Sequence, residues 1–455
     1  MINDKNTFED YLLNIQIDRD KENYVLKFAQ DNSLSSQCSI FIESFSIIIK
    51  SVVFAVPPEV FQFVQLIKTD NSQITPENAI KYEIIPFIIQ MLTLDTPLTV
   101  LSQSLNIINT FCYYSDILLK VILRNHILEF LPQIFSYPDP SFCIQTHISI
   151  LFVNLTNYMD IPHEVILECA RIFTEQAIIW AVNDKEENFE CQKNCLTFLF
   201  NVIVGSEKNL TIEYVRHISK FAFSILVSNN IALLSLAAYI LVQIISNYEL
   251  ILEPSDIFNS ILWNYIKTEA ASPVLRLACE TLNTSTEFPT DIKIIWELLI
   301  EAMLSENIEV SSLACRLAKC LINGGIEVIE EALQKGILDV STRIMNDGSF
   351  KAMKAITMMI RNILIIGNIQ QQKLIFNHSI IISFLKFIEG YDSDEAALCM
   401  SAMNESVKAI IGIDTSFVNT FKQNIPFELM STLLVHSNDN VCVYTKMILE
   451  SLGVE

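Results

Sequence analysis

Two stretches decide the fold, because they align without a gap: "VIEEALQKGILDVSTRIMNDGSFKAMKAITMMIRNILIIGN" (residues 328–368) and "ILLKVILRNHILEFLPQIFSYPDPSFCIQTHISILFVNLTN" (residues 117–157). Each stretch predicts a short helix, a turn, a second helix, a polar loop and a longer third helix that carries an asparagine. The turn falls at Gly336 in one stretch and at Asn125 and His126 in the other. Glycine and asparagine both tolerate the left-handed backbone that such a turn needs. Self-similarity at this period predicts a repeat protein.

Helical periodicity extends along the rest of the chain. Apolar residues recur every three or four positions, as at Ile144, Ile148, Leu151 and Leu155, and almost no stretch alternates with period two. Further copies of the pattern fit residues 81–111, 375–404 and 420–452. Pro86 and Pro426 stand where a second helix would begin, a position at which the missing N–H of proline costs nothing.

The composition excludes several classes of function. Among 455 residues, 51% are hydrophobic, so the chain has ample apolar surface to bury. The net charge of −22 disfavours a nucleic-acid-binding surface, which needs clustered Lys and Arg. Eight of the nine glycines follow residue 300, which excludes glycine loops for phosphate from the first two thirds.

We expect an intracellular protein, cytoplasmic or nuclear. The stretch "MINDKNTFEDYLLNIQ" at residues 1–16 lacks the basic and apolar regions of a secretory signal. The eleven cysteines then fit reduced thiols rather than a disulfide framework. The longest apolar run, residues 231–245, is shorter than the roughly 20 residues that cross a bilayer, so we expect no membrane association.

The third helices carry a motif that resembles the armadillo repeat. The motif reads "NIINTF" (106–111), "LFVNLT" (151–156), "LFNVIV" (199–204) and "MIRNIL" (359–364). The resemblance implies an all-α, right-handed superhelical solenoid of the armadillo or HEAT type with about nine repeats. The expected units are 76–115, 116–160, 161–205, 206–248, 249–287, 288–325, 326–368, 369–412 and 413–455. Units 249–287 and 288–325 lack the motif and fit two-helix HEAT-like units equally well, and residues 1–75 form an atypical helical capping segment.

One asparagine recurs per unit, at spacings of 45 and 47 residues from Asn109 to Asn154 to Asn201. A row of primary amides on the concave face of a solenoid can pair with the backbone of an extended peptide. The resemblance implies this clamp at Asn109, Asn154, Asn201 and Asn362, with Gln243 and Asn283 as weaker substitutes. Alternatively, each asparagine bonds to the neighbouring repeat and orders the stack.

The residues beside the asparagines differ from one branch of the family. Importin-alpha-type receptors place a tryptophan one helical turn before the asparagine, where it holds ligand lysines. This chain has no such ladder and no basic N-terminal arm, and the groove suits apolar or mixed side chains at least as well. The positions that flank the groove are held by Leu105, Ile150, Thr197, Tyr239 and Met358, with His147 two turns before Asn154.

Catalytic and metal-binding motifs are missing. "HEVIL" at His163 has Leu167 where a zinc protease needs its second histidine, and Cys191 and Cys195 lack a second pair at zinc-site spacing. We therefore expect no enzyme activity, no metal and no cofactor.

The sequence favours a non-catalytic adaptor that holds an extended peptide segment of another protein in its concave groove. One alternative is a karyopherin-alpha-like nuclear transport adaptor, which would bind Lys-rich cargo in a salt-sensitive way. The other is a structural scaffold that uses its convex face or its ends. That scaffold would keep its partners when Asn154, Asn201 and Asn362 are changed together to alanine. The oligomeric state stays open.

Overall fold

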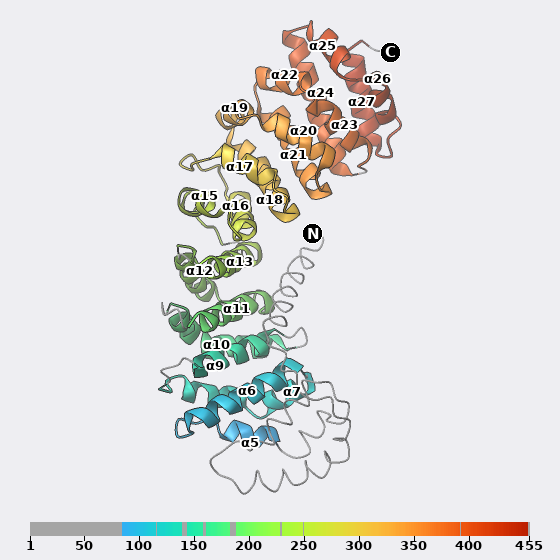
Figure 1. Ribbon diagram of the computed structural model, residues 1–455. Helices are drawn as coiled ribbons and strands as arrows, with labels where there is room; N and C mark the ends of the chain where they lie inside the picture. The colour runs from blue at the N-terminus through green and yellow to red at the C-terminus, as the bar shows by residue number, and fades with distance from the viewer. Residues whose placement is uncertain are drawn as a thin grey trace, which may run out of the picture.

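The computed structural model describes residues 84–453 except 115, 139–142, 158–160, 183–187, 228–229, 249 and 392. The expected capping segment 1–75 lies outside these residues. All regular elements of the described chain are helical, which confirms the all-α prediction. The helices stack into an elongated, curved array that runs from α5 (Ile84–Gln90) to α27 (Asp439–Ser451) (Figure 1).

A series of long helices forms the spine of the array, and we call them the ladder helices. Each one contacts the next in chain order. They are α6 (Leu98–Tyr114), α9 (Cys143–Thr156), α11 (Phe189–Gly205), α13 (Ile231–Tyr248), α16 (Ala271–Thr284), α18 (Ile308–Leu321), α21 (Phe350–Ile366), α24 (Asp394–Ile413) and α27.

Shorter helices fill the chain between the ladder helices. A pair of helices precedes α9, α21, α24 and α27. These pairs are α7 (Asp116–Arg124) with α8 (Ile127–Phe130) and η1 (Leu131–Ile134), α19 (Ile326–Gln334) with α20 (Ile337–Asp347), α22 (Ile369–Asn377) with α23 (Ile380–Glu389), and α25 (Phe417–Asn424) with α26 (Phe427–Leu433).

A single main helix precedes α11, α13 and α18, and a set of short helical pieces precedes α16. The single helices are α10 (His163–Ala181), α12 (Ile212–Leu226) and α17 (Trp296–Met303). The short pieces are α14 (Pro254–Ile257), the π-helical η3 (Phe258–Leu262) and α15 (Trp263–Tyr265), and a 3₁₀ turn η4 (Ile322–Gly324) follows α18. In the middle of the array, Figure 1 shows α13, α16 and α18 on the concave side and α12, α15 and α17 on the convex side.

Left-handed residues separate the two outer helices in two of the units that have such a pair. Gly336, with φ of 81°, separates α19 from α20, and His126, with φ of 58°, separates α7 from α8. Both turns lie where the sequence placed them, and Pro426 directly precedes α26 as predicted.

The three-helix prediction is wrong for units 161–205 and 206–248. No Gly, Pro or Asn interrupts the 19 residues of α10 or the 15 residues of α12, so each stays a single helix. The sequence left two-helix units open as an alternative for 249–287 and 288–325, and the second of these contains α17 and α18 as its main helices.

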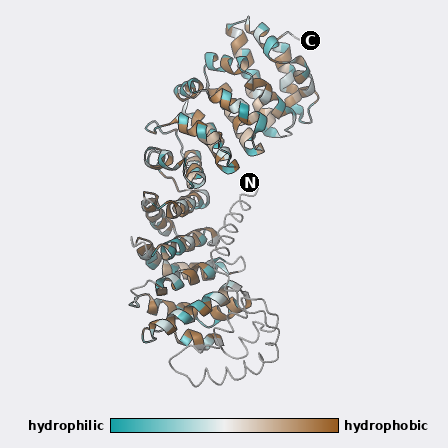
Figure 2. Cartoon of the chain, viewed as in Figure 1, coloured by the Kyte–Doolittle hydropathy of each residue, from teal (hydrophilic) through white to brown (hydrophobic). Residues whose placement is uncertain are grey.

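One continuous apolar core runs the length of the described chain, from Ile85 to Leu452. Aromatic rings link neighbouring units within it: Phe152 of α9 stacks on Phe173 of α10, with ring centroids 4.1 Å apart, and Phe198 of α11 meets Phe173 edge-on at 5.1 Å. Figure 2 shows that each helix carries both hydrophobic and hydrophilic residues, as expected when one face packs against neighbours and another meets solvent.

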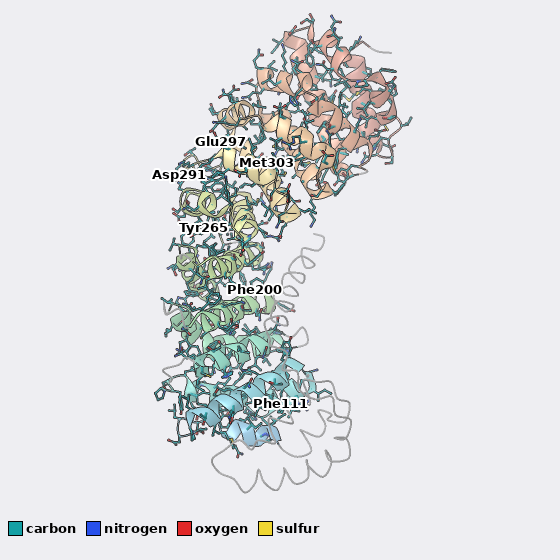
Figure 3. All side chains as sticks on the ribbon, in the orientation of Figure 1. Phe111, Phe200, Tyr265, Asp291, Glu297 and Met303 are labelled. Carbon is teal, nitrogen blue, oxygen red and sulfur yellow. The ribbon has the colours of Figure 1, made fainter. Side chains whose placement is uncertain are left out.

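Polar contacts join successive units, and their chemistry changes along the chain. Neutral hydrogen bonds dominate the first half: Tyr137 Oη donates to the Thr96 carbonyl at 2.8 Å, and the Ser206 and Tyr248 hydroxyls lie 2.8 Å apart. Ion pairs join units in the second half. They include Lys267–Glu301, Arg276–Glu309, Arg316–Glu280, Lys335–Glu297, Lys354–Glu395 and Lys373–Asp414. Figure 3 places Glu297 on the convex side, so the ion pairs are not confined to one face.

Among the helices of the described residues, α13 and α24 are long and apolar enough to cross a membrane by length and composition alone. In each case 56% of the most apolar window is buried within the protein. Both are ladder helices that pack between two others, which accounts for their apolar character without a bilayer.

The left-handed turn at Gly336 yields a stability prediction. Gly336→Ala should lower the free energy of unfolding by about 1 kcal/mol, because an L side chain disfavours positive φ. The matched control is Gly412→Ala, which lies in helix α24 with open space around the added methyl and should be neutral or slightly stabilising. Urea unfolding followed by circular dichroism measures both. Equal effects of the two changes would contradict the assigned turn.

Candidate protein-binding surface

The asparagine row lies between ladder helices. The Asn109 amide on α6 donates to the His147 carbonyl of α9 at 2.9 Å, and the Asn154 amide on α9 donates to the Asn109 carbonyl at 3.4 Å. The Asn201 amide on α11 reaches back to α9, where it donates to the Thr156 hydroxyl at 3.3 Å. These three side chains are only 6%, 7% and 6% exposed.

The expected peptide clamp at Asn109, Asn154 and Asn201 is therefore corrected. Their amide nitrogens bond to the adjacent ladder helix, which is the stack-ordering arrangement that the sequence left as an alternative. The spacing of 45 to 47 residues places Asn154 and Asn201 opposite the same part of the preceding ladder helix, whereas Asn109 bonds forward to the following one. That spacing fits a contact between units as well as it fits a row in a groove, so it could not distinguish the two.

The three remaining amides of the expected row differ from these. Asn362 of α21 is half-buried and donates to the Asn323 side chain just after α18 at 2.9 Å, again between units. Asn283 of α16 is exposed, and its side-chain oxygen accepts from the Cys320 thiol at 3.3 Å. Gln243 of α13 is half-buried and accepts from Asn247 within its own helix. No single row of free amides results at these six positions.

The residues expected to flank the groove differ in how deeply they are buried. Leu105 is fully buried, so it belongs to the core and not to a groove wall. Ile150, Thr197 and Met358 are half-buried, and Met358 contacts Cys399 of α24 at 4.0 Å. His147 and Tyr239 are half-buried too, and the His147 carbonyl accepts the Asn109 amide.

Charge on the ladder helices changes abruptly along the array. Helices α6, α9 and α13 contain no Asp, Glu, Lys or Arg, and α11 contains one acidic and one basic residue. In contrast, α21 contains Lys351, Lys354 and Arg361 and no acidic residue. On a chain with a net charge of −22, this is an unusual local excess of positive charge.

Four side chains of α18 and α21 form what we call the basic strip: Arg316, Lys319, Lys354 and Arg361. Lys354 pairs with Glu395 of α24 at 2.7 Å, and the charge of Lys319 also lowers the pKa of Glu395, which places all three groups near one another. Burial raises the pKa of the Cys399 thiol on α24, and the charge of Arg361 opposes this rise, which places Arg361 near α24 as well. The strip therefore runs across α18 and α21 and borders α24.

The members of the strip are satisfied to different degrees. Arg316 pairs with Glu280 at 2.8 Å and is 34% exposed, while Lys354 is 39% exposed. Burial raises the pKa of Glu395, but hydrogen bonds from Lys354 and Tyr391 outweigh it and lower that pKa overall. Within the described chain, no carboxylate pairs with Lys319 or Arg361. Arg361 donates to the Asn362 side chain at 3.2 Å, and its Nε is buried without an acceptor.

Sequence reasoning missed the basic strip. Lys319 and Lys354 are 35 residues apart, and they come together only when the unit length and the helix register are known. The signal that could have found them was the charge of α21, where three basic residues occur without an acidic one.

Two stretches with candidate metal ligands, one at His163 and one at Cys191 and Cys195, lie in the described chain. No group of three or more His, Cys, Asp or Glu there could hold a metal ion. His163 of the "HEVIL" stretch lies 3.3 Å from the carboxylate of the next residue, Glu164, and the two side chains are 43% and 70% exposed. Cys191 and Cys195 are fully buried in α11.

Comparisons with known proteins bear on the fold alone. No family model matches the sequence, and no curated protein matches it. A crystal structure of an engineered protein from a structural genomics consortium is similar, with a TM-score of 0.64 and 16% sequence identity over 91% of this chain and 99% of that chain. A second engineered protein covers 62% of this chain at 15% identity, with a TM-score of 0.34. The first likeness supports the helical architecture at low sequence identity.

The buried asparagines predict a stability effect. Asn154→Ala should lower the free energy of unfolding by about 1 kcal/mol, because it removes a hydrogen bond between buried groups of α6 and α9. The matched control is Asn106→Ala, at an exposed position of α6, with an expected change within about 0.5 kcal/mol. Both are measured by urea unfolding. If Asn106→Ala were as costly as Asn154→Ala, the role assigned to the asparagine row would be wrong.

Proposed function

We propose that this chain is a non-catalytic scaffold of the armadillo and HEAT type that binds a segment of another protein along its ladder helices. In this proposal the nine ladder helices mark nine units of a right-handed superhelix, with three-helix units at the C-terminal end and mixed units before them. The asparagine motif keeps its place in the unit, but its role is to join units. The protein would act in the cytoplasm or the nucleus.

The observation that carries the proposal is the basic strip. Ladder helices α18 and α21 present Arg316, Lys319, Lys354 and Arg361 at half-buried positions, and two of the four lack a carboxylate partner in the described chain. Half-buried cations without a carboxylate partner are well placed to meet carboxylates of a ligand, and electrostatic complementarity of this kind sets specificity and association rate. Towards the N-terminal end of the array, beyond α16, the ladder helices α6, α9 and α13 are uncharged and suit the neutral or apolar part of the same ligand.

This charge distribution selects among the three candidate functions. A Lys-rich nuclear-transport cargo would meet like charge at the basic strip, so the karyopherin-like alternative is disfavoured there. A partner segment with acidic and apolar residues fits instead. The purely structural alternative, in which the convex face or the ends make the contacts, remains the competing function.

A direct binding measurement tests the proposal. The probe is a fluorescent peptide of alternating Glu and Leu, compared with one of alternating Lys and Leu, titrated with the full chain and followed by anisotropy. The double variant Lys319→Glu/Arg361→Glu should bind the Glu peptide about tenfold more weakly than the unmodified protein, equivalent to about 1.4 kcal/mol. Added salt should weaken the binding to the unmodified protein.

The matched control is Lys220→Glu/Lys422→Glu, which makes the same change in net charge at exposed positions of α12 and α25. It should change the affinity by less than about twofold. Equal loss in both variants would show that only net charge matters. Tighter binding of the Lys peptide to the unmodified protein would favour the karyopherin-like alternative, and partners captured equally from a native cell extract by all three proteins would favour the structural scaffold.

A further inference from the structure

Two cysteines from successive units lie close together where helix α16 packs against helix α18. Cys279 of α16 is fully buried, and Cys320 of α18 is 4% exposed. Their thiols are close enough to share a hydrogen bond. The Cys279 thiol also lies 3.7 Å from the Leu313 carbonyl of α18, and the Cys320 thiol lies 3.3 Å from the Asn283 side chain of α16. Each sulfur is thus held against the opposite helix.

Polar contacts fix the register of the two helices around this pair. One turn before Cys320, the Arg316 guanidinium donates to Glu280, the residue after Cys279, at 2.8 Å. One turn after Cys279, Asn283 accepts from Cys320. A second ion pair, Arg276 with Glu309, joins the same helices at 3.1 Å. Three contacts therefore hold α16 and α18 in the register that brings the sulfurs together.

The surroundings differentiate the two thiols. The hydrogen bond from Cys279 lowers the pKa of Cys320, and the charges of Lys319 and Arg316 lower it further. Burial raises the pKa of Cys279. A thiolate beside cations is the reactive form of cysteine, while a buried thiol beside it is placed to act as the second partner.

We propose that Cys279 and Cys320 form a redox modification site, in which a peroxide converts the two thiols to a disulfide that links successive units. The Cys320 thiolate attacks one peroxide oxygen, so that an S–O bond forms, the O–O bond breaks and hydroxide leaves. Cys279 gives its proton to that hydroxide, which becomes water, and attacks the sulfenic sulfur, so that the S–S bond forms and the sulfenic oxygen leaves as hydroxide. This second hydroxide takes up the proton that Cys320 released to solvent when its thiolate formed. In sum, two thiols and one hydrogen peroxide give one disulfide and two waters, and two electrons pass from sulfur to oxygen.

A second buried pair shows why proximity alone is insufficient. Cys191 and Cys195 share helix α11 at positions i and i+4 and are fully buried. Side chains at this spacing have Cβ atoms about 5–6 Å apart, whereas a disulfide needs about 3.5–4.5 Å. The Cys279–Cys320 pair joins two separate helices, so the fixed spacing within a single helix does not apply to it, and it has the cations Arg316 and Lys319 beside it. The Cys191–Cys195 pair is therefore an internal control, in which we expect no disulfide.

The experiment treats the full chain with a small excess of hydrogen peroxide, alkylates the remaining thiols and maps disulfides by non-reducing peptide mass spectrometry. A peptide linked through Cys279 and Cys320 should form, and dithiothreitol should reverse it. Cys279→Ser should abolish the link and leave a sulfenic acid on Cys320 that dimedone traps. Cys320→Ser should abolish both the link and the trapping. Cys195→Ser should leave the link unchanged, and circular dichroism confirms that the variants fold.

Two results would overturn the proposal. One is that Cys279 and Cys320 stay alkylated as free thiols at a peroxide dose that oxidises the more exposed Cys143 or Cys442. The other is that Cys320 advances to sulfinic acid in the unmodified protein without a link to Cys279. Because neither outcome involves a binding partner, this test is independent of the proposed scaffold function.

Discussion

The packing of each ladder helix against the next is the interaction on which the rest of the structure depends. Helices such as α11 and α13 are apolar on most of their circumference and cannot bury that surface within their own unit. They bury it between a preceding and a following ladder helix, so each unit completes the core of its neighbours. The buried amides of Asn109 and Asn154 and the ion pairs of Arg276 and Arg316 then fix the register of a contact that apolar packing alone leaves free to slide.

Much of this architecture could be predicted from local sequence, because helices and turns are local. The period of apolar residues predicted the helices, and Gly336 and His126 lie at the predicted turns. The number of helices per unit was predicted less well. The family pattern implied three, but the uninterrupted sequence of α10 keeps a single helix. In that case the local absence of a helix breaker was the better guide than the resemblance.

The site was less predictable, because it depends on contacts between units. The sequence identified Asn154 as a recurring residue, yet the direction in which its side chain points depends on which carbonyl of α6 lies opposite it. The basic strip joins Lys319 to Lys354 and Glu395 across three helices, and the thiol pair joins residues 279 and 320. Both sets are scattered in sequence and become visible only once the ladder register is known. They also show that a ladder contact can carry chemistry as well as stability.

Native-state hydrogen exchange of a ladder variant tests most directly whether unit-to-unit packing holds the array. Leu199→Ala removes a fully buried side chain of α11 and should cost about 2–5 kcal/mol locally. If each unit depends mainly on its neighbours, exchange should accelerate in α9, α11 and α13 and stay unchanged in α21, α24 and α27. Equal acceleration along the whole chain, or acceleration confined to α11, would contradict this account.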